Sequence, residues 1–181
     1  NCRVFNAGEY RRRILKGFQD NSFFDTNNAE HSNKKEEIFE ICFCELLEWL
    51  NTGGGEVGIL DATNTTKERR QLICNVVEDT GINLNIIFLE LITNDEDVID
   101  KNLKLKMQSP DYADKEPDFA INDFKKRVEM YNNIYKTIDD NEGLNYIKKY
   151  NFDDKICLKN ISGICEAHIM SYLINLKIVN C

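Results

Sequence analysis

An apolar run that ends in a carboxylate is the part of the chain whose residue types most clearly suggest chemistry. Residues 58–60 are Gly-Ile-Leu, and they are followed by Asp61, a stretch rich in hydroxyl side chains, and the pair Arg69-Arg70. In open α/β folds, an acidic residue at the carboxyl end of a buried strand points into the crevice where ligands bind. Asp61 could there hold Mg²⁺ or orient a nucleophile, and the fork of a guanidinium suits a phosphate. The whole string is more specific than a strand-end aspartate alone, and it predicts a site that handles phosphate groups.

These residues must be positioned by the elements around them, and the chain alternates between strand-like and helix-like patterns. We expect strands at 2–6, 56–61, 84–92, 146–150 and 155–158, and helices at 9–16, 29–51, 65–80, 95–107, 117–135 and 162–176. This alternation predicts an α/β fold with a largely parallel sheet and helices on both faces. Thr65-x-x-Glu68 has the form of a capping box, which predicts Thr65 as a helix N-cap, with Asn64 in the turn before it. No linker or internal repeat is visible, so residues 1–181 are expected to form one domain.

The chain is acidic overall, but its basic residues are clumped. Lys and Arg number 23 and Asp and Glu number 31, which gives a net charge of −8 over 181 residues. This balance argues against nucleic acid and anionic membranes as partners. The clumps at 11–13, 69–70 and 125–127 suit a small, highly charged anion, although a solvated helix face is the ordinary explanation for any one of them. Arg127 and Tyr131, four residues apart, would share one helix face.

The cysteines suggest a reducing compartment rather than a metal centre. The chain has seven cysteines without a Cys-x-x-Cys pair, and its two histidines, His31 and His168, stand apart. An odd number of thiols, most of them in apolar stretches, predicts reduced and buried cysteines in a cytoplasmic protein. No signal peptide or membrane span is apparent in the sequence.

Four motifs in order give the chain a family resemblance that spans nearly its whole length. They are Val4-Phe5-Asn6-x-Gly8-x-Tyr10-Arg11-Arg12, Asp61-Ala62-Thr63-Asn64-Thr65-Thr66-x-Glu68-Arg69-Arg70, Lys106-x-x-Ser109-Pro110-Asp111-Tyr112 and Arg127-Val128-Glu129-x-Tyr131. The chain resembles the kinase domain of the 6-phosphofructo-2-kinase/fructose-2,6-bisphosphatase family. The resemblance implies a P-loop fold related to the nucleotide kinases. It also implies transfer of the γ-phosphoryl group of ATP, with Mg²⁺, to the 2-hydroxyl of fructose 6-phosphate. The product, fructose 2,6-bisphosphate, regulates glycolysis.

The resemblance also implies roles for individual residues. Asp61 would belong to the Mg²⁺ shell or accept the proton of the sugar hydroxyl, and the two roles are not separated. Lys106 would lie near both the ATP phosphates and the sugar. Fructose 6-phosphate would be bound by Arg11, Lys35, Thr63, Arg69, Arg127 and Tyr131. Arg12, Arg13 and Arg70 are expected to support the site from behind or to lie on the surface.

The chain departs from the family pattern at several points. The Gly-x-x-x-x-Gly-Lys-Thr loop that cradles ATP phosphates should lie before the strand at 2–6, and it is not in the sequence. We therefore expect a fragment of a longer kinase, without a central strand of its sheet and inactive alone, rather than a damaged copy. Lys35 stands where the family has an arginine, and Thr93 stands close to a family cysteine. Asn102 is not assigned to the adenine, because the segment before Lys106 is one residue short.

Two functions from different classes remain open at this stage. The first is a sugar-phosphate kinase, and the second is a non-catalytic relative that binds fructose 6-phosphate as a regulatory or scaffold module. A P-loop kinase for another phosphorylated sugar is a more distant alternative. No Arg-His-Gly motif occurs, so a bisphosphatase domain is either absent or lies beyond Cys181. A homodimer is possible, and the residues do not decide it.

Overall fold

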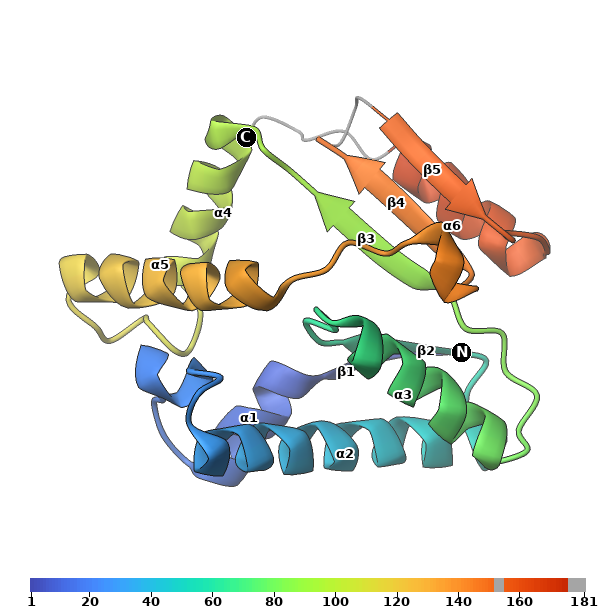
Figure 1. The fold of residues 1–181 in the computed structure, drawn as a ribbon, viewed down its shortest axis with the longest axis horizontal. Coiled ribbons are helices and arrows are strands. Elements are labelled where there is room, and N and C mark those ends of the chain that lie inside the picture. The colour runs from blue at the N-terminus through green and yellow to red at the C-terminus, as the bar shows by residue number, and fades with distance from the viewer. Residues whose placement is uncertain (152–154, 176–181) are drawn as a thin grey trace.

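The strands in the described part of the chain form two separate sheets (Figure 1). The fold is that of a computed structural model, which describes residues 1–151 and 155–175. The strands are β1 (Cys2–Asn6), β2 (Val57–Asp61), β3 (Phe88–Ile92), β4 (Tyr146–Tyr150) and β5 (Lys155–Lys159). β1 pairs with β2 and β3 with β4 in parallel, whereas β5 pairs with β4 in antiparallel orientation. The expected α/β class and the mostly parallel pairing are confirmed.

The described strands do not form one continuous sheet. Among the described strands, β2 has only β1 as a neighbour and β3 has only β4, so no strand joins the two sheets. Val4 and Ile59 are register partners on β1 and β2, and their side chains are 54% and 45% exposed. Leu89 and Leu91 on β3 are exposed as well. Parallel strands are normally covered on both faces, so both sheets carry apolar surface that the described residues leave open.

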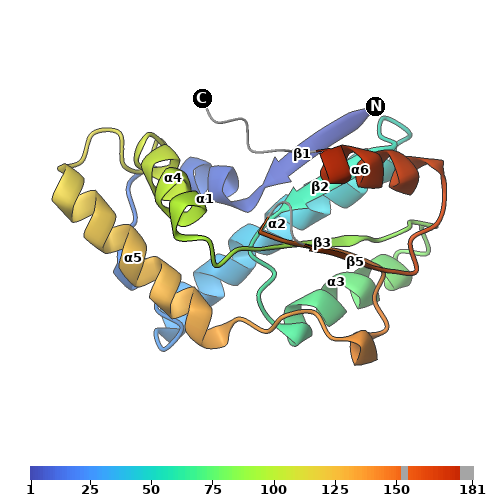
Figure 2. The same ribbon diagram turned by 90° about the horizontal axis from the view of Figure 1, so that it is seen from above.

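The helices lie on both sides of the strands, as the alternating pattern predicts. They are α1 (Ala7–Leu15), α2 (Ala29–Asn51), α3 (Lys67–Asp79), α4 (Glu96–Met107), α5 (Pro117–Ile134) and α6 (Ile164–Asn175), with two 3₁₀ helices, η1 (Asn21–Phe24) and η2 (Asp140–Glu142). α3 and α6 lie on opposite sides of the molecule when it is seen from above (Figure 2). α2 packs against β1, β2, α1 and η1. No helix within the described ranges is both long and apolar enough to cross a membrane.

The helix ends follow local chemistry, with one correction. Asn28 caps α2 by accepting the backbone N–H of His31 at 3.1 Å, and Pro117 is the first residue of α5, where its missing N–H costs nothing. Thr65 is not the cap of α3, because Thr66 Oγ1 accepts the backbone N–H of Arg69 at 3.2 Å. Residue 65 instead contributes its backbone carbonyl, which accepts a hydrogen bond from the N–H of residue 136 at 2.8 Å.

The third strand is shorter than its apolar sequence predicts. Only Phe88–Ile92 pairs with β4, although the apolar run begins at residue 84. The side-chain amide of Asn145 donates to the Ile86 carbonyl at 3.2 Å and to the Asn85 side chain at 3.1 Å. The Asn145 side chain thus occupies the Ile86 carbonyl, which in a longer strand would accept a hydrogen bond from the backbone of the neighbouring strand.

The core lies mainly between α2 and β1 and is aromatic. Its buried members include Phe5, Phe39, Phe43 and Cys42. The expectation of buried thiols is correct for Cys42 but wrong for three others, since Cys2, Cys44 and Cys165 are exposed. Cys181 and the expected last helical residue, 176, lie outside the described residues.

Candidate functional site

β1 and β2 end side by side, which places Asn6 next to Asp61. The Asn6 amide donates from Nδ2 to the Asp61 carboxylate, and its Oδ1 accepts the backbone N–H of Glu9 at 2.9 Å. Asn6 is therefore both the N-cap of α1 and the partner of Asp61. Because the strands are parallel, the pair lies at the carboxyl edge of the sheet, and Asp61 is exposed there. Within the described ranges, no group of three or more His, Cys, Asp or Glu side chains could hold a metal ion.

A cluster of cations gathers around one buried carboxylate, that of Asp111. Arg11 Nη2 donates to both Asp111 oxygens at 2.6 Å, and Arg12 Nη1 lies 3.5 Å from Oδ2. Arg11 Nε is buried, and no described residue accepts from it. Burial lowers the pKa of the Lys106 ammonium, and the nearby guanidinium groups of Arg11, Arg12 and Arg127 lower it further, while Asp111 opposes them. Asp111 therefore pairs with two guanidinium groups, and the positive charges of Lys106 and Arg127 lie nearby.

Arg127 on α5 is held in place by a second buried carboxylate, that of Asp123. Arg127 Nε donates to Asp123 Oδ2 at 2.9 Å, and Nη2 donates to the backbone carbonyl of Gln19. Asp123 accepts three further hydrogen bonds, from the Tyr112 hydroxyl at 2.7 Å and from the backbone and side chain of Asn21 at 2.6 and 2.9 Å. Because both oxygens of Asp123 are fully used, the guanidinium has a fixed orientation.

The remaining sugar-binding candidates on α2, α5 and the loop after β2 make specific contacts. The Tyr131 hydroxyl is hydrogen-bonded to Thr63; burial raises the pKa of Tyr131, and the Thr63 bond, Arg11 and Arg127 oppose that rise. Lys35 Nζ donates to the backbone carbonyl of Phe24 at 3.3 Å. Burial lowers the pKa of Lys35.

The two neighbouring arginines of α3 have different environments. Arg69 pairs with Glu36, stacks over the Phe39 ring at 3.8 Å, and keeps a buried Nη1 that no described residue accepts from. Arg70 is fully engaged: it donates to both Glu142 oxygens at 2.8 Å and to the carbonyls of residues 64 and 136 at 3.2 and 3.0 Å. Arg70 is thus an interior structural residue, and its placement on the surface is excluded.

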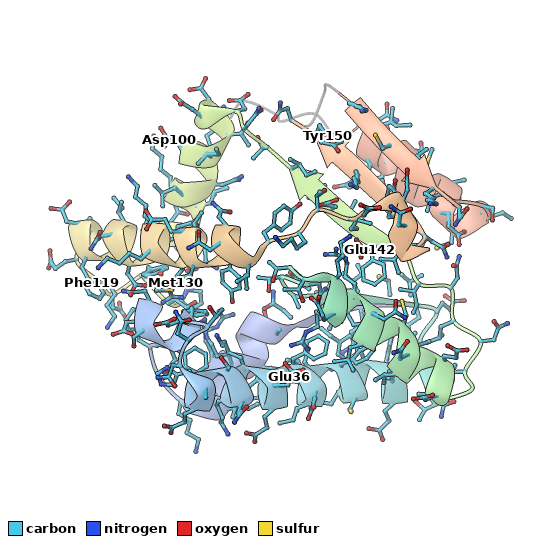
Figure 3. All side chains as sticks on the ribbon, in the orientation of Figure 1. Glu36, Asp100, Phe119, Met130, Glu142 and Tyr150 are labelled. Carbon is cyan, nitrogen blue, oxygen red and sulfur yellow. The ribbon has the colours of Figure 1, made fainter. Side chains whose placement is uncertain are left out.

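The structure brings most of the predicted site residues together. Arg11 and Arg127 both lie over the ring of Phe24, which also contacts Tyr131, and the charges of the two arginines act on Lys106. Figure 3 shows side chains filling the space between α5, where Met130 is labelled, and α2, where Glu36 is labelled. Arg69 reaches the same helix α2 through Glu36.

Asp61 and two positions that the sequence did not assign to the site lie apart from this cluster. Asp61 has its described side-chain hydrogen bond to Asn6 at the sheet edge rather than within the cluster. Thr93 and Asn102 line a separate hollow of 130 Å³ together with Lys149.

Sequence reasoning missed the buried acids that hold the arginines. Asp111 lies inside the third motif, but a motif does not tell which of its residues faces a ligand. Asp123 stands four residues before Arg127, and this spacing on a helix is a recognised signal for an ion pair. Asn6 and Phe24 gave no comparable signal, because their roles depend on contacts between distant parts of the chain.

Comparison with known proteins assigns the chain to a family. A sequence model of the 6-phosphofructo-2-kinase family matches residues 1–180. The chain belongs to the 6-phosphofructo-2-kinase family. The 6-phosphofructo-2-kinase 1 of Saccharomyces cerevisiae is 36% identical over 183 residues, which cover 99% of this chain and 22% of that protein. A 6-phosphofructo-2-kinase/fructose-2,6-bisphosphatase of Gallus gallus is 32% identical over 96% of this chain and 37% of its own length.

The family relationship therefore concerns a part of each relative. A protein of Schizosaccharomyces pombe named as a probable 6-phosphofructo-2-kinase is 35% identical over 98% of this chain and 27% of its own length. This chain thus spans 22–37% of these relatives. Membership of the 6-phosphofructo-2-kinase family, which was expected from the four motifs, is confirmed.

Proposed function

We propose that residues 1–181 belong to a 6-phosphofructo-2-kinase domain, which transfers the γ-phosphoryl group of ATP to the 2-hydroxyl of fructose 6-phosphate. The product would be fructose 2,6-bisphosphate, a regulator of glycolysis. The observation that carries the proposal is the cationic cluster of Arg11, Lys106 and Arg127 in a member of this family. With Arg12, the cluster has four cations and two buried carboxylates, Asp111 and Asp123, so its excess positive charge suits a phosphorylated substrate.

The sugar phosphate is assigned to residues with unused hydrogen-bond donors. Arg11 Nε and Arg69 Nη1 are buried and without an acceptor among the described residues, which is expensive in a protein interior. A phosphate oxygen or a sugar hydroxyl at these positions would remove that cost. Lys35, Thr63 and Tyr131 complete the proposed set. Lys35 supplies charge without the planar fork of an arginine, which weakens its grip on a phosphate.

Asp61 and Lys106 are assigned to the nucleotide side of the reaction. Mg²⁺ is held in phosphoryl-transfer enzymes by one or two carboxylates together with phosphate oxygens, and Asp61 presents one exposed carboxylate at the sheet edge. When bound, Mg²⁺ would neutralise charge on the phosphoryl group that is transferred. Asp61 would bind that ion or accept the proton of the sugar hydroxyl. Lys106 would stabilise negative charge between ATP and the sugar, with Asp111 favouring its charged form.

A P-loop fold is part of the same proposal. A strand between β2 and β3 would join the two sheets and use the edges that the described strands leave unpaired. Such a strand and the helix after it would also cover Ile59, Leu89 and Leu91, which are now exposed. The glycine-rich loop between that strand and helix would lie at the carboxyl edge, where Asp61 lies, with backbone N–H groups facing the ATP phosphates.

The expected surroundings of the enzyme are proposals as well. We place it in the cytoplasm, because its described cysteines are free thiols. We propose small-molecule substrates, because the net charge of the chain is negative. Neither nucleic acid nor a membrane is proposed as a partner, and a homodimer is left to measurement.

The proposed function is tested by ADP release from ATP·Mg²⁺ in the presence of fructose 6-phosphate. The chain is compared with a version that carries the proposed upstream P-loop segment, and each is paired with its Asp61→Asn variant. We expect sugar-dependent turnover only in the extended protein and its loss in the Asp61→Asn variant. Glu129→Gln, a change of an exposed carboxylate on α5, is the control for a simple loss of charge.

Two results would contradict the kinase proposal. Turnover absent from both forms, with fructose 6-phosphate still bound, would indicate a non-catalytic sugar-phosphate sensor or scaffold. Turnover with another phosphorylated sugar and none with fructose 6-phosphate would change the substrate.

A further inference from the structure

Phe24, the last residue of η1, lies where several proposed sugar-phosphate ligands meet. The Arg11 guanidinium lies 5.2 Å from the centre of the Phe24 ring, and the Arg127 guanidinium lies 4.2 Å from it. The ring of Tyr131 is 6.2 Å away, and the Phe24 carbonyl accepts a hydrogen bond from Lys35. Four side chains from α1, α2 and α5 thus contact a single residue.

The ring offers these cations a favourable environment that does not compete with a ligand. The face of an aromatic ring carries negative potential and attracts a cation within about 6 Å of its centre. Asp111 and Asp123 attract Arg11 and Arg127 more strongly, but they also occupy hydrogen-bond donors. A ring contact holds a guanidinium by its plane and leaves its N–H groups available. Phe24 therefore limits where the two arginine side chains can lie but leaves their hydrogen-bond donors free to bind a ligand.

The position of Phe24 is itself fixed by packing and by hydrogen bonds of η1. The Phe24 side chain is buried, and its ring meets the ring of Phe23 edge-on at 5.4 Å. Asp20 caps η1 by accepting the backbone N–H of Ser22 at 2.9 Å. The backbone N–H of Asn21 donates to Asp123, which joins η1 to α5. The ring is consequently a rigid part of the fold rather than a mobile cover.

We propose that Phe24 is a positioning residue for sugar-phosphate binding. Its ring sets the relative placement of Arg11 and Arg127, so that both meet one phosphorylated sugar without rearrangement. The inference rests on the proposed function, since it concerns the fructose 6-phosphate site. It predicts that removing the ring weakens binding of the sugar phosphate while leaving the nucleotide steps unchanged.

The test compares Phe24→Leu with Phe23→Leu. Leucine keeps an apolar side chain but has no ring face. Phe23 is the matched control, because it is also buried in η1, yet within the described ranges no lysine or arginine lies over its ring. Binding of fructose 6-phosphate is measured by isothermal titration calorimetry, with inorganic phosphate and fructose as separate probes. Circular dichroism and thermal melting establish that each variant is folded.

We expect Phe24→Leu to raise the Kd for fructose 6-phosphate about tenfold, because two arginine side chains would then have to be ordered when the ligand binds. Phe23→Leu should change it less than about twofold, and Phe24→Tyr, which keeps the ring, should bind like the wild type. In the extended kinase, Phe24→Leu should raise the KM for fructose 6-phosphate and leave kcat and the KM for ATP unchanged. If Phe24→Leu does not fold, Phe24→Met is measured against the same thresholds.

The outcomes separate this inference from the proposed function. If neither the wild-type chain nor the extended kinase binds fructose 6-phosphate, the proposed function is overturned and this inference with it. A wild-type chain that binds the sugar phosphate, with Phe24→Leu within twofold of it, would overturn only the positioning role. Equal losses in Phe24→Leu and Phe23→Leu would also overturn it, because they would assign the effect to general packing.

Discussion

Replacing Asp123 by asparagine should destabilise the protein far more than an ordinary change of one charge. Asp123 is 1% exposed, and its two oxygens accept from Tyr112, Arg127 and twice from Asn21. Asparagine would turn an N–H₂ group toward some of these donors and leave the buried guanidinium without a counter-charge. Breaking a buried ion pair in this way costs about 3–5 kcal/mol. For a chain of this length, that loss lowers Tm by roughly 6–20 °C.

The assay is urea unfolding followed by circular dichroism, with Glu129→Gln as the control on the same helix. Glu129 is exposed, so its change should alter the free energy of unfolding by less than about 0.5 kcal/mol. A loss below about 1 kcal/mol in Asp123→Asn would refute the reasoning, because the observed hydrogen bonds would then have no energetic weight.

The same variant should change the response of stability to acid. Burial raises the pKa of the Asp123 carboxyl, but hydrogen bonds from Tyr112 and Asn21 and the Arg127 charge outweigh it and lower the pKa below its ordinary value of 3.8. A lowered folded-state pKa contributes stability above the unfolded value and loses it as the pH falls through the folded value. The wild type should therefore lose stability more steeply than Asp123→Asn when the pH is lowered below about 4.

Three further predictions concern neighbouring or matched residues. Arg70→Ala should lower the free energy of unfolding by about 3–5 kcal/mol, because it breaks a buried ion pair. Arg69→Ala should chiefly weaken the binding of fructose 6-phosphate. Urea unfolding and calorimetry distinguish the two effects, and the reverse pattern would contradict both placements. Thr66→Ala should lose about 1 kcal/mol and Thr65→Ala much less in urea unfolding, and equal losses would restore Thr65 as the cap. The pKa of Lys106 is lowered by burial and by nearby arginines, and a bound phosphate would raise it. Binding of the sugar phosphate should therefore take up protons and weaken as the pH rises through the pKa of the free protein. Calorimetry in two buffers of different ionisation enthalpy measures this uptake, and the absence of proton uptake at every alkaline pH would contradict the prediction.

The local structure could be predicted well from the sequence. The bounds of α2 and β4 match those expected, because clear apolar periodicity and end signals such as Gly53 define them. Errors occurred where tertiary contacts decide, as when the Asn145 side chain shortened β3 or when the loop at Thr65 moved the cap to Thr66. Which strands pair with which could not be read from the strand patterns, because pairing depends on contacts between distant parts of the chain.

The sequence proposed the cations of the candidate site but not the acids that hold them. Arg11 and Arg127 were proposed as sugar-phosphate ligands because they match residues of the family motifs. Their partners Asp111 and Asp123 were not found, because a buried acid and a surface acid look the same in a sequence. In the sequence, Phe24 looks like any buried core residue. Only its distances to the guanidinium groups of Arg11 and Arg127 suggest that it also positions these side chains.

The two hydrogen bonds of the Asn6 side chain, to Asp61 and to the backbone of Glu9, restrict which residues can replace it at the end of β1. An aspartate would keep the helix cap but add a second negative charge beside Asp61, and a serine would keep the cap while losing the amide donor. Leucine would remove both bonds. The neighbouring glycine is constrained in turn, since a Cβ on Gly8 would lie 3.0 Å from Asn6 Oδ1. A change that reorients this one amide would therefore disturb both the start of α1, which carries Arg11, and the carboxylate of Asp61 at the sheet edge.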